Sequence, residues 1–478
     1  MVQRPYRFAV ARQRQIAGLP VLAVFASASH SCHAMIGSDG RGRLDFIFTA
    51  IFLALVLAIG GARDRYPLLE MMVELGALAM LLYFCWTRGL PRWRIGNRFP
   101  LVILCLMLAL PLLQLVPLPP GIWTALPGRE LAARITAIAG LDGIWRPLSL
   151  DPEATRRSLL FLLPGVAMFV VVGLFLPASD RPRLLWIVLG FAFFGVFLGG
   201  VQLASGDGSG VTPFRSQHTG YAVGLFVNRN QHATFLLVAM LMAGSLGGTL
   251  RRLRAARMLI AGAILLLAVG VVATTSRTGT ATIPFVLVVS LLLLFHDRMN
   301  WRVAGAGAVG LLVIGVLITQ SQVVDQTLAR YGRLDDARFL YWRDVLWALP
   351  QYWPAGTGIG TFDPIYRAAE SLENVGPYYV NHAHNDYLEL ALTGGLPALI
   401  IFALFVVFLL VAMWRIARGG VTRSERMVGL GALAGITVIL AHSYVEYPLR
   451  TLTLEVLFGL LCGLLLPPAE EEAKPDVG

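Results

Sequence analysis

Two histidines that lie just before an apolar run have the chemistry of a general base. His382 and His384 belong to the run His-Ala-His-Asn-Asp at 382–386. Histidine titrates near neutral pH, so His384 could take a proton from a hydroxyl group. The plainer interpretation of His384 is a capping or hydrogen-bonded loop residue at the start of a helix.

Metal binding is a third interpretation of this run, because His382, His384 and Asp386 alternate like ligands. No further cluster of histidine or cysteine completes such a site. We therefore expect no metal and no other cofactor.

Arginines at the ends of apolar runs form a second group with recognisable chemistry. Arg277 interrupts an otherwise apolar stretch, and Arg215 and Arg229 precede another apolar run. A charge at the centre of a bilayer costs about 2.5–3.5 kcal/mol or more, so it is seldom kept without a partner. One interpretation of Arg277 is an interfacial arginine that snorkels to lipid phosphates. The functional interpretation is an anion clamp, because the guanidinium fork suits phosphate oxygens.

The glycine-rich stretch at 356–362 (GTGIGTF) superficially resembles a phosphate-binding loop. It lacks the Lys-Ser/Thr pair of a P-loop, so a tight turn permitted by glycine is the better interpretation. We expect this turn to position Trp342, Phe362 and Tyr366 for stacking on a sugar.

Apolar runs are the elements that must position all these residues. The chain has 478 residues, of which 56% are hydrophobic and only 14% are charged, whereas soluble domains are about 25% charged. Runs of about 20 apolar residues, each long enough to cross a bilayer as a helix, recur along the chain. The composition predicts an all-α polytopic membrane protein and excludes a water-soluble enzyme. The net charge of +11 comes from arginines that punctuate the apolar runs, a topology signal, so we expect no nucleic-acid partner.

The hydropathy pattern predicts twelve membrane-spanning helices, with arginine-rich short loops on the cytoplasmic side and both termini inside. The expected spans lie at approximately 44–60, 67–86, 99–116, 158–177, 183–204, 231–248, 257–275, 278–295, 302–320, 388–413, 426–443 and 450–467.

This layout divides the chain into six segments. Residues 1–43 form a cytoplasmic or interfacial segment or a leader before a start at Met35, with a cleaved signal peptide as the alternative. The others are 44–204, which holds spans one to five and an outer segment at 117–157; 205–320, which holds spans six to nine with arginines at their outer ends; the periplasmic loop 321–387; spans ten to twelve at 388–467; and an acidic cytoplasmic tail at 468–478.

The predicted topology brings the chemically interesting residues to one face of the membrane. The outward group comprises Arg215, Arg229, Asn230, Arg277, Arg338, His382, His384 and Asn385. Arg338 could bind sugar or diphosphate, or pair with Asp335 or Asp336.

These motifs together resemble the bacterial O-antigen ligase and O-antigen or exopolysaccharide polymerase family. The resemblance rests on His384-Asn385-Asp386-Tyr387-Leu388, followed by Gly394-Gly395-Leu396-Pro397; on Gly224 to Asn230 (GLFVNRN); on Ser276-Arg277-Thr278-Gly279; and on Arg338 and Trp342 before the glycine-rich stretch. Each motif alone is weak, but their order on one membrane face is fairly specific.

The resemblance implies a metal-independent, GT-C-like membrane glycosyltransferase of the bacterial inner membrane with its active site facing the periplasm. Its donor would be an undecaprenyl-pyrophosphate-linked glycan, and its acceptor a saccharide on lipid A core or on a growing polysaccharide. His384 would be the base, and Arg277 with Arg215 would hold the pyrophosphate. Arg229, Asn230, Arg338, His382 and Asn385 would contact substrate.

Ligase and polymerase both fit this pattern, because Ala398 stands where ligases often have Gly, Thr or Tyr. A transporter or flippase for a lipid-linked sugar is the rival from another class. Transporters usually place polar groups near the bilayer midplane in paired repeats, whereas here they collect at one face. The pattern therefore favours chemistry at the outer surface.

Overall fold

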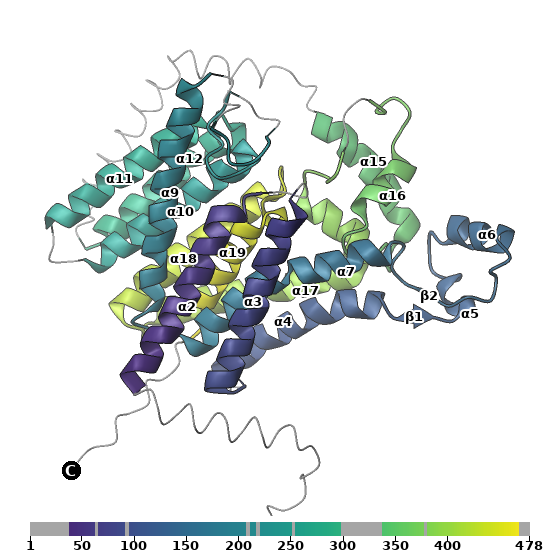
Figure 1. Cartoon of the computed structure of the whole chain (residues 1–478), viewed down its shortest axis with the longest axis horizontal. Helices are drawn as coiled ribbons and strands as arrows, with labels where there is room; N and C mark the ends of the chain where they lie inside the picture. Colours follow the sequence, from purple (N-terminus) through teal and green to yellow (C-terminus); the bar gives the residue numbers. More distant parts are fainter. Residues whose placement is uncertain are drawn as a thin grey trace, which may run out of the picture.

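The computed structural model describes residues 38–62, 66–90, 95–206, 211–216, 220–250, 254–297, 337–376 and 380–467. The elements of this part of the chain, in order, are α2 (Ser38–Ile59), α3 (Pro67–Arg88), α4 (Ile95–Gln114), β1 (Pro117–Leu118), α5 (Pro120–Trp123), α6 (Glu130–Ile138), β2 (Arg146–Pro147), α7 (Pro152–Phe161), α8 (Leu163–Val170), a π-helical turn (Val171–Phe175), α9 (Arg181–Ala204), α10 (Arg229–Thr249), α11 (Arg254–Ala273), α12 (Arg277–Phe295), α15 (Ala337–Tyr352), α16 (Phe362–Ala369), α17 (Asp386–Arg418), α18 (Arg423–His442), the 3-10 turn η2 (Pro448–Arg450) and α19 (Leu452–Leu464) (Figure 1).

The predicted all-α membrane architecture is confirmed. Ten helices among the described residues are long and apolar enough to cross a membrane, and they coincide with ten of the predicted spans. The twelfth predicted span corresponds to α19, a shorter apolar helix of 13 residues. The ninth, at 302–320, lies outside the described residues, as do residues 1–37 and the acidic tail.

Helix α10 is the central helix of the bundle, and it packs against α9, α11, α12 and α18 (Figure 1). It is almost entirely buried because it is rich in glycine, alanine and serine, which let neighbouring backbones approach closely. A Cβ atom on Gly244 would lie 2.4 Å from the carbonyl oxygen of Ser290 on α12. This tight packing fixes the start of α10 relative to α12 and α18.

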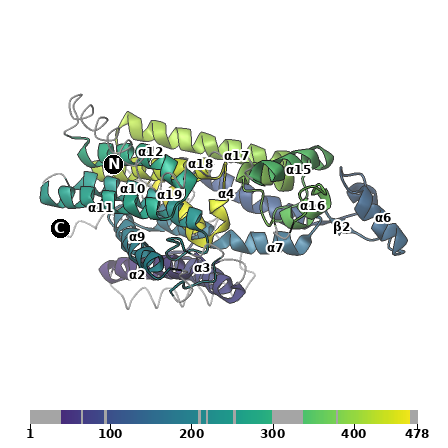
Figure 2. The same ribbon diagram turned by 90° about the horizontal axis from the view of Figure 1, so that it is seen from above.

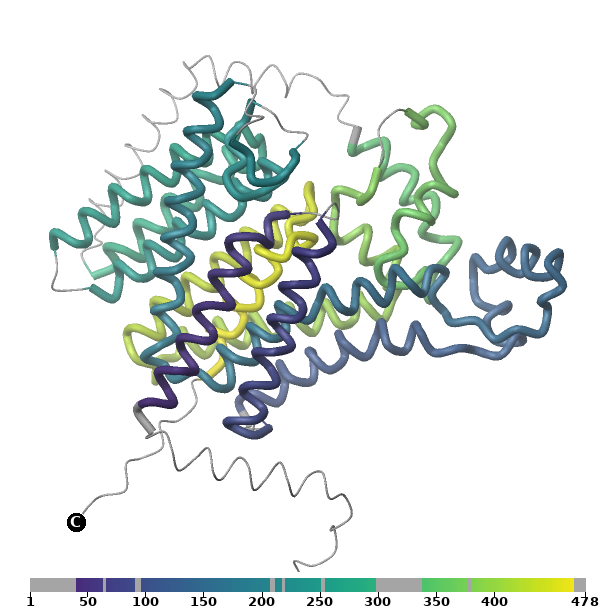
Figure 3. The backbone as a smooth tube through the Cα atoms, viewed as in Figure 1, coloured from purple at the N-terminus to yellow at the C-terminus, as the bar shows by residue number. Residues whose placement is uncertain are grey.

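The connections that carry the polar motifs meet at one end of the bundle, as the predicted topology requires. Helix α2 runs beside α19, so segments from the two ends of the sequence are neighbours (Figure 3). Backbone hydrogen bonds then tie these connections together: Thr453 to Gly60 (3.3 Å), Val227 to Gly61 (3.1 Å), and Asp386 to Ser443 (2.8 Å).

Helix α17 is broken where it passes the glycine-rich stretch, and the break explains two motifs at once. Gly395 has φ 61°. The carbonyls of Leu392 and Thr393 have no helical partners, because the amide of Leu396 donates to Pro354 and Pro397 has no amide hydrogen. The amides of Thr357 and Gly358 donate to these carbonyls at 3.1 and 2.9 Å. Protein groups thus satisfy the backbone that the break leaves open, as a membrane helix requires. Figure 2 shows α15 and α16 at this end of α17.

The glycine-rich stretch is a turn, as predicted, with positive φ at Gly356, Gly358 and Gly360. The buried guanidinium of Arg129 donates to the carbonyls of Gly356 and Leu148, at 3.1 and 2.7 Å. The turn therefore joins the outer segment at 117–157, where β1 pairs antiparallel with β2, to α17.

The prediction that Phe362 and Tyr366 stack on sugar is wrong. Both side chains are buried in a small apolar core that α15 and α16 share, with Val345 and Ala348. The Tyr366 hydroxyl contacts Asp344 at 3.4 Å, and burial raises the pKa of that hydroxyl. The indole of Trp342 donates to the carbonyl of Ala383 at 2.9 Å, so this aromatic residue supports the loop that carries the histidines.

Candidate functional site

The histidine run forms the turn that starts α17. Asn385 caps the helix: its buried side-chain oxygen accepts from the amides of Tyr387 and Leu388 at 3.0 and 3.1 Å. The preceding residue, His384, has φ 50°, a left-handed conformation that is uncommon outside glycine. Strained residues of this kind cluster at functional sites. The backbone conformation of His384 therefore indicates a functional role independently of its residue type.

Glu446, in the connection between α18 and α19, joins three of the polar residues singled out in the sequence. Its Oε1 accepts from the Asn230 amide and forms an ion pair with Arg338. Its Oε2 faces Nδ1 of His384 at 3.6 Å. The carboxylate is buried. Asn230, Arg338 and His384, which lie far apart in the sequence, therefore surround the charge of Glu446.

The electrostatics of this group keep Glu446 ionised. Burial by itself raises the pKa of a carboxyl group, but the positive charge of Arg338 and the neighbouring His384 outweigh it and lower the pKa of Glu446 to about 2. Arg338 thus pairs with Glu446; the alternative partners Asp335 and Asp336 lie outside the described residues.

Arg229, a predicted substrate contact, lies near the turn that carries the predicted clamp residue Arg277, next to this group. Arg229 is the first residue of α10, and its Nη1 donates to Oγ1 of Thr275 at 2.8 Å, two residues before Arg277 at the start of α12. The Arg229 guanidinium also lies 4.1 Å from the centre of the Tyr221 ring.

His442 ties the three helices beneath this group together. Its Nδ1 contacts Oγ1 of Thr234 on α10 at 2.7 Å, and its Nε2 contacts Oγ1 of Thr282 on α12 at 3.1 Å. The starts of α10 and α12 are therefore fixed against the end of α18, close to Glu446.

Arg215, the predicted partner of Arg277 in the clamp, has a different setting. Arg215 is exposed, and its backbone amide donates to the hydroxyl of Tyr66, before α3, at 2.8 Å. The described contacts of Arg215 therefore connect it to the start of α3, and those of Arg229 connect it to the Arg277 turn.

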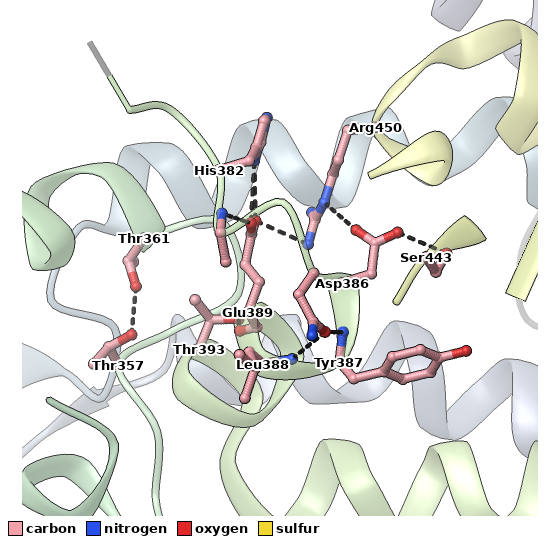
Figure 4. Close-up of polar contacts among 12 residues, drawn as sticks. Thr357, Thr361, His382, Asp386, Tyr387, Leu388, Glu389, Thr393, Ser443 and Arg450 are labelled. Atoms are coloured by element: carbon pink, nitrogen blue, oxygen red, sulfur yellow. Dashed lines mark hydrogen bonds and ion pairs between the residues drawn. The ribbon is translucent and has the colours of Figure 1, made fainter. Parts of the chain in front are cut away.

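A second group of charges surrounds His382 (Figure 4). Nδ1 of His382 lies 3.1 Å from Glu389, and Arg450 lies 3.1 Å from the same carboxylate and 3.6 Å from Asp386. The Ser443 hydroxyl donates to Asp386 at 2.8 Å. Burial opposes the charge of Arg450, but the two carboxylates raise its pKa. These charges compensate one another, as buried charges must.

A cavity of about 710 Å³ opens beside this second group. Its walls are mainly apolar side chains of α4, α8, α17 and α19, among them Ile103, Phe169, Phe402, Phe405 and Phe458. Its polar lining includes His382, Asp386 and Arg450. An apolar pocket with a few polar groups is typical of a ligand site, and this one suits a molecule with a hydrocarbon chain and a polar head.

The comparison with known proteins points to one family. Residues 262–403 match the family described as O-antigen ligase. This match supports the O-antigen ligase and polymerase family for the chain. Members of that family are glycosyltransferase-like enzymes of O-antigen biosynthesis. No curated protein matches the chain.

The segment that matches the O-antigen ligase family contains Arg277, Arg338, His382, His384 and Asn385. Arg215, Arg229 and Asn230 lie before it. The structure brings Asn230, Arg338 and His384 around Glu446, places Arg229 near the Arg277 turn, and leaves Arg215 near α3. In the described part of the chain, no group of three or more histidine, cysteine or acidic side chains is arranged to hold a metal.

Sequence reasoning missed Glu389, Glu446 and Arg450. All three are charged residues in or next to apolar runs. Glu446 lies in the short connection between the last two predicted spans, and Arg450 is the first residue of the last predicted span. That setting was the available signal, because the predicted topology already placed this connection on the outer face with the histidines.

Proposed function

We propose that this protein transfers a glycan from an undecaprenyl-pyrophosphate carrier to a saccharide acceptor at the periplasmic face of the inner membrane. The observation that carries the proposal is the position of His384. This histidine lies in a strained turn beside a buried carboxylate, at the end of the bundle where Arg229 and the Arg277 turn meet. A base and a phosphate-binding group in one place are the parts that such a transfer needs.

In the proposed reaction His384 accepts the proton of an acceptor hydroxyl while the hydroxyl oxygen bonds to the anomeric carbon of the donor. The bond from that carbon to the pyrophosphate oxygen breaks, and undecaprenyl pyrophosphate leaves with the electron pair. Preorganised donors aimed at a leaving oxyanion are commonly the largest catalytic contribution. We assign that role to Arg277.

The second clamp arginine is Arg229 or Arg215. The sequence pattern favours Arg215. The contact of Arg229 with Thr275 favours Arg229, because it places this guanidinium close to the Arg277 turn. Its stacking on Tyr221 also orients the fork of donors before any substrate arrives. We propose Arg229 and keep Arg215 as the matched comparison.

The apolar cavity supports a lipid-linked substrate. It lies between membrane helices, and its lining includes His382, whose ring contacts Tyr447; the Tyr447 ring also contacts His384. A hydrocarbon chain bound there would leave its sugar near the proposed base.

The deciding experiment is the surface glycan of a strain that lacks the gene, complemented with the wild type or with His384→Ala. Lipopolysaccharide is separated on a gel, and secreted polysaccharide is quantified. Loss of all O-antigen from lipid A, with long chains left on the carrier, indicates a ligase. Survival of single-repeat lipopolysaccharide, or loss of the secreted polymer alone, indicates a polymerase. If the strain complemented with His384→Ala shows the same normal glycan profiles as the strain complemented with the wild type, the proposal is overturned and lipid-linked sugar transport is favoured.

A further inference from the structure

Two histidines near the start of α17 each face a buried glutamate, His382 facing Glu389 and His384 facing Glu446. The two glutamates differ in how many of their contacts are already made. Glu389 is fully engaged: it contacts Nδ1 of His382, the Ala383 amide and Arg450 at 3.1 Å each. Glu446 instead uses Oε1 for Asn230 and Arg338, and its Oε2 faces His384.

We propose that Glu446 is the positioning residue for the base: its Oε2 binds Nδ1–H of His384 and so leaves Nε2 as the nitrogen that takes the proton. This inference rests on the proposed function, since it gives His384 the role of base. It adds a residue that lies outside the matched family segment, in the connection after α18.

The geometry supports a pair that closes when substrate binds. Nδ1 of His384 is buried and has no hydrogen-bond partner among the described residues. At 3.6 Å from Oε2 it is slightly beyond hydrogen-bond distance. Catalytic hydrogen bonds are often long before substrate binds and tighten in the complex. If Nδ1 carries the proton, as the proposal requires, Oε2 at 3.6 Å is the acceptor that could satisfy it.

The carboxylate is held in place from two other elements. Asn230 at the start of α10 and Arg338 at the start of α15 both bind Oε1. Glu446 therefore cannot turn away from His384 without breaking contacts to two elements. A base oriented by a third group that is itself anchored is the general logic of catalytic triads.

The charge of this pair determines a pH signature. The charges of Glu446 and Arg338 act in opposite directions on a proton bound at this pair, so replacing one or the other should move the acid limb of the rate in opposite directions. The charged and titratable groups around the pair are Arg338 and Tyr341 from α15, His442 from α18, Asp386 from α17, and Tyr447 beside Glu446. Of these, Arg338 contacts Glu446 directly and opposes the effect of Glu446 on His384.

The first test is Glu446→Gln. Its amide would donate to Nδ1 of His384 and so hold the proton on Nε2, the wrong nitrogen for a base. We expect the turnover rate to fall about 10²-fold, within the range that general base catalysis contributes. We also expect the midpoint of the acid limb of the rate to move to lower pH by about one unit, because the carboxylate no longer stabilises the imidazolium.

Arg338→Gln provides the opposite sign. Arg338 is the first of the charges that lower the pKa of buried Glu446. Removing this cation therefore makes it easier for the Glu446–His384 pair to bind a proton, at either group. The acid limb should move to higher pH. The control is Glu373→Gln, which removes an exposed carboxylate that pairs with Arg343 at 3.4 Å; its acid limb and rate should match the wild type.

Rates are measured at pH 5.5–9 with purified, detergent-solubilised full-length protein. The donor is lipid-linked glycan extracted from the deletion strain. Two acceptors are tested, the lipid A core and the polysaccharide fraction of that strain. Opposite shifts in the two variants support the inference. If His384→Ala is inactive but neither variant shifts the acid limb, Glu446 does not position the base, and the proposed function stands. If His384→Ala is fully active, the base assignment itself fails. Where Glu446→Gln does not insert into the membrane, the sign of the Arg338→Gln shift decides.

Discussion

His382 and His384 both contact the ring of Tyr447, with centroid distances of 4.8 and 4.7 Å, and each turns Nδ1 toward a different buried glutamate. The chain therefore places two histidine–carboxylate pairs around one aromatic ring, and Arg450 neutralises one pair and Arg338 the other. One pair lines the apolar cavity, and the other lies with the clamp arginines. From this division we assign a structural role beside the apolar cavity to His382 and proton transfer to His384.

Substitution of the two histidines should separate these roles. His384→Ala should reduce transfer by about 10²- to 10⁴-fold, the contribution of a general base, with unchanged amounts of protein in the membrane. His382→Ala leaves Glu389 with Arg450 and should lower thermal stability more than the chemical step. Single-turnover rates and melting in detergent measure the two effects. Equal loss of rate in both variants would contradict the division of roles.

Lysine substitutions test the arginine clamp. Arg277→Lys and Arg229→Lys keep the charge but lose the bidentate fork, so each should cost about 10²- to 10³-fold in rate, the usual effect of losing one donor to an oxyanion. Arg215→Lys is the comparison and should keep most of the activity. If Arg215→Lys is the damaging variant and Arg229→Lys is not, the clamp consists of Arg215 and Arg277, as the sequence pattern favours.

The ionisation of Glu446 predicts how stability depends on pH. Its pKa in the folded protein is lowered to about 2, whereas an unfolded glutamate titrates near pH 4.3. The ionised carboxylate therefore stabilises the fold above about pH 4.3, and this contribution is lost as the pH falls toward 2. The melting temperature of the wild type should drop more steeply below pH 4.5 than that of Glu446→Gln. Parallel curves would show that Glu446 is not preferentially ionised in the fold.

Chelation tests the expectation that the transfer needs no metal. After exhaustive treatment with EDTA and removal of the chelator, the purified protein should retain its full rate, because arginine donors supply the positive charge at the leaving group. A loss of activity that added zinc or magnesium restores would overturn this expectation.

Hydropathy alone predicted most of the fold, because a segment of about 20 apolar residues has few structures available in a bilayer other than a spanning helix. It also predicted that the polar motifs share one end of the bundle. It could not predict which polar residues meet. The contacts of Glu446 with Asn230 and Arg338 span more than a hundred residues each, and they depend on how helices pack rather than on local pattern.

The prediction for the aromatic residues of the outer loop was wrong for a related reason. The sequence predicts that the loop between spans presents Phe362 and Tyr366 to substrate. In the structure, α15 and α16 form a small core of their own that buries both rings. Apolar side chains favour burial wherever a second surface is available. The sequence around Phe362 and Tyr366 does not show that α15 provides such a surface.

The break in α17 leads to a prediction about glycine that has an internal control. Gly395 has φ 61°, and a Cβ atom there would lie 2.2 Å from the carbonyl oxygen of Pro354. Gly395→Ala therefore combines a backbone penalty of about 1–3 kcal/mol, because φ 61° with ψ −158° is a nearly glycine-only conformation, with the overpacking of a tight contact, about 1–3 kcal/mol. Gly419 has φ 86° but open space around its Cβ position, so Gly419→Ala should show the backbone penalty alone. Melting of the two variants in detergent measures the difference.

Because the break holds the glycine-rich turn against the start of α17, Gly395→Ala should also lower the transfer rate, whereas Gly419→Ala should leave it unchanged. Equal destabilisation by both alanines would mean that the contact with Pro354 does not constrain the site.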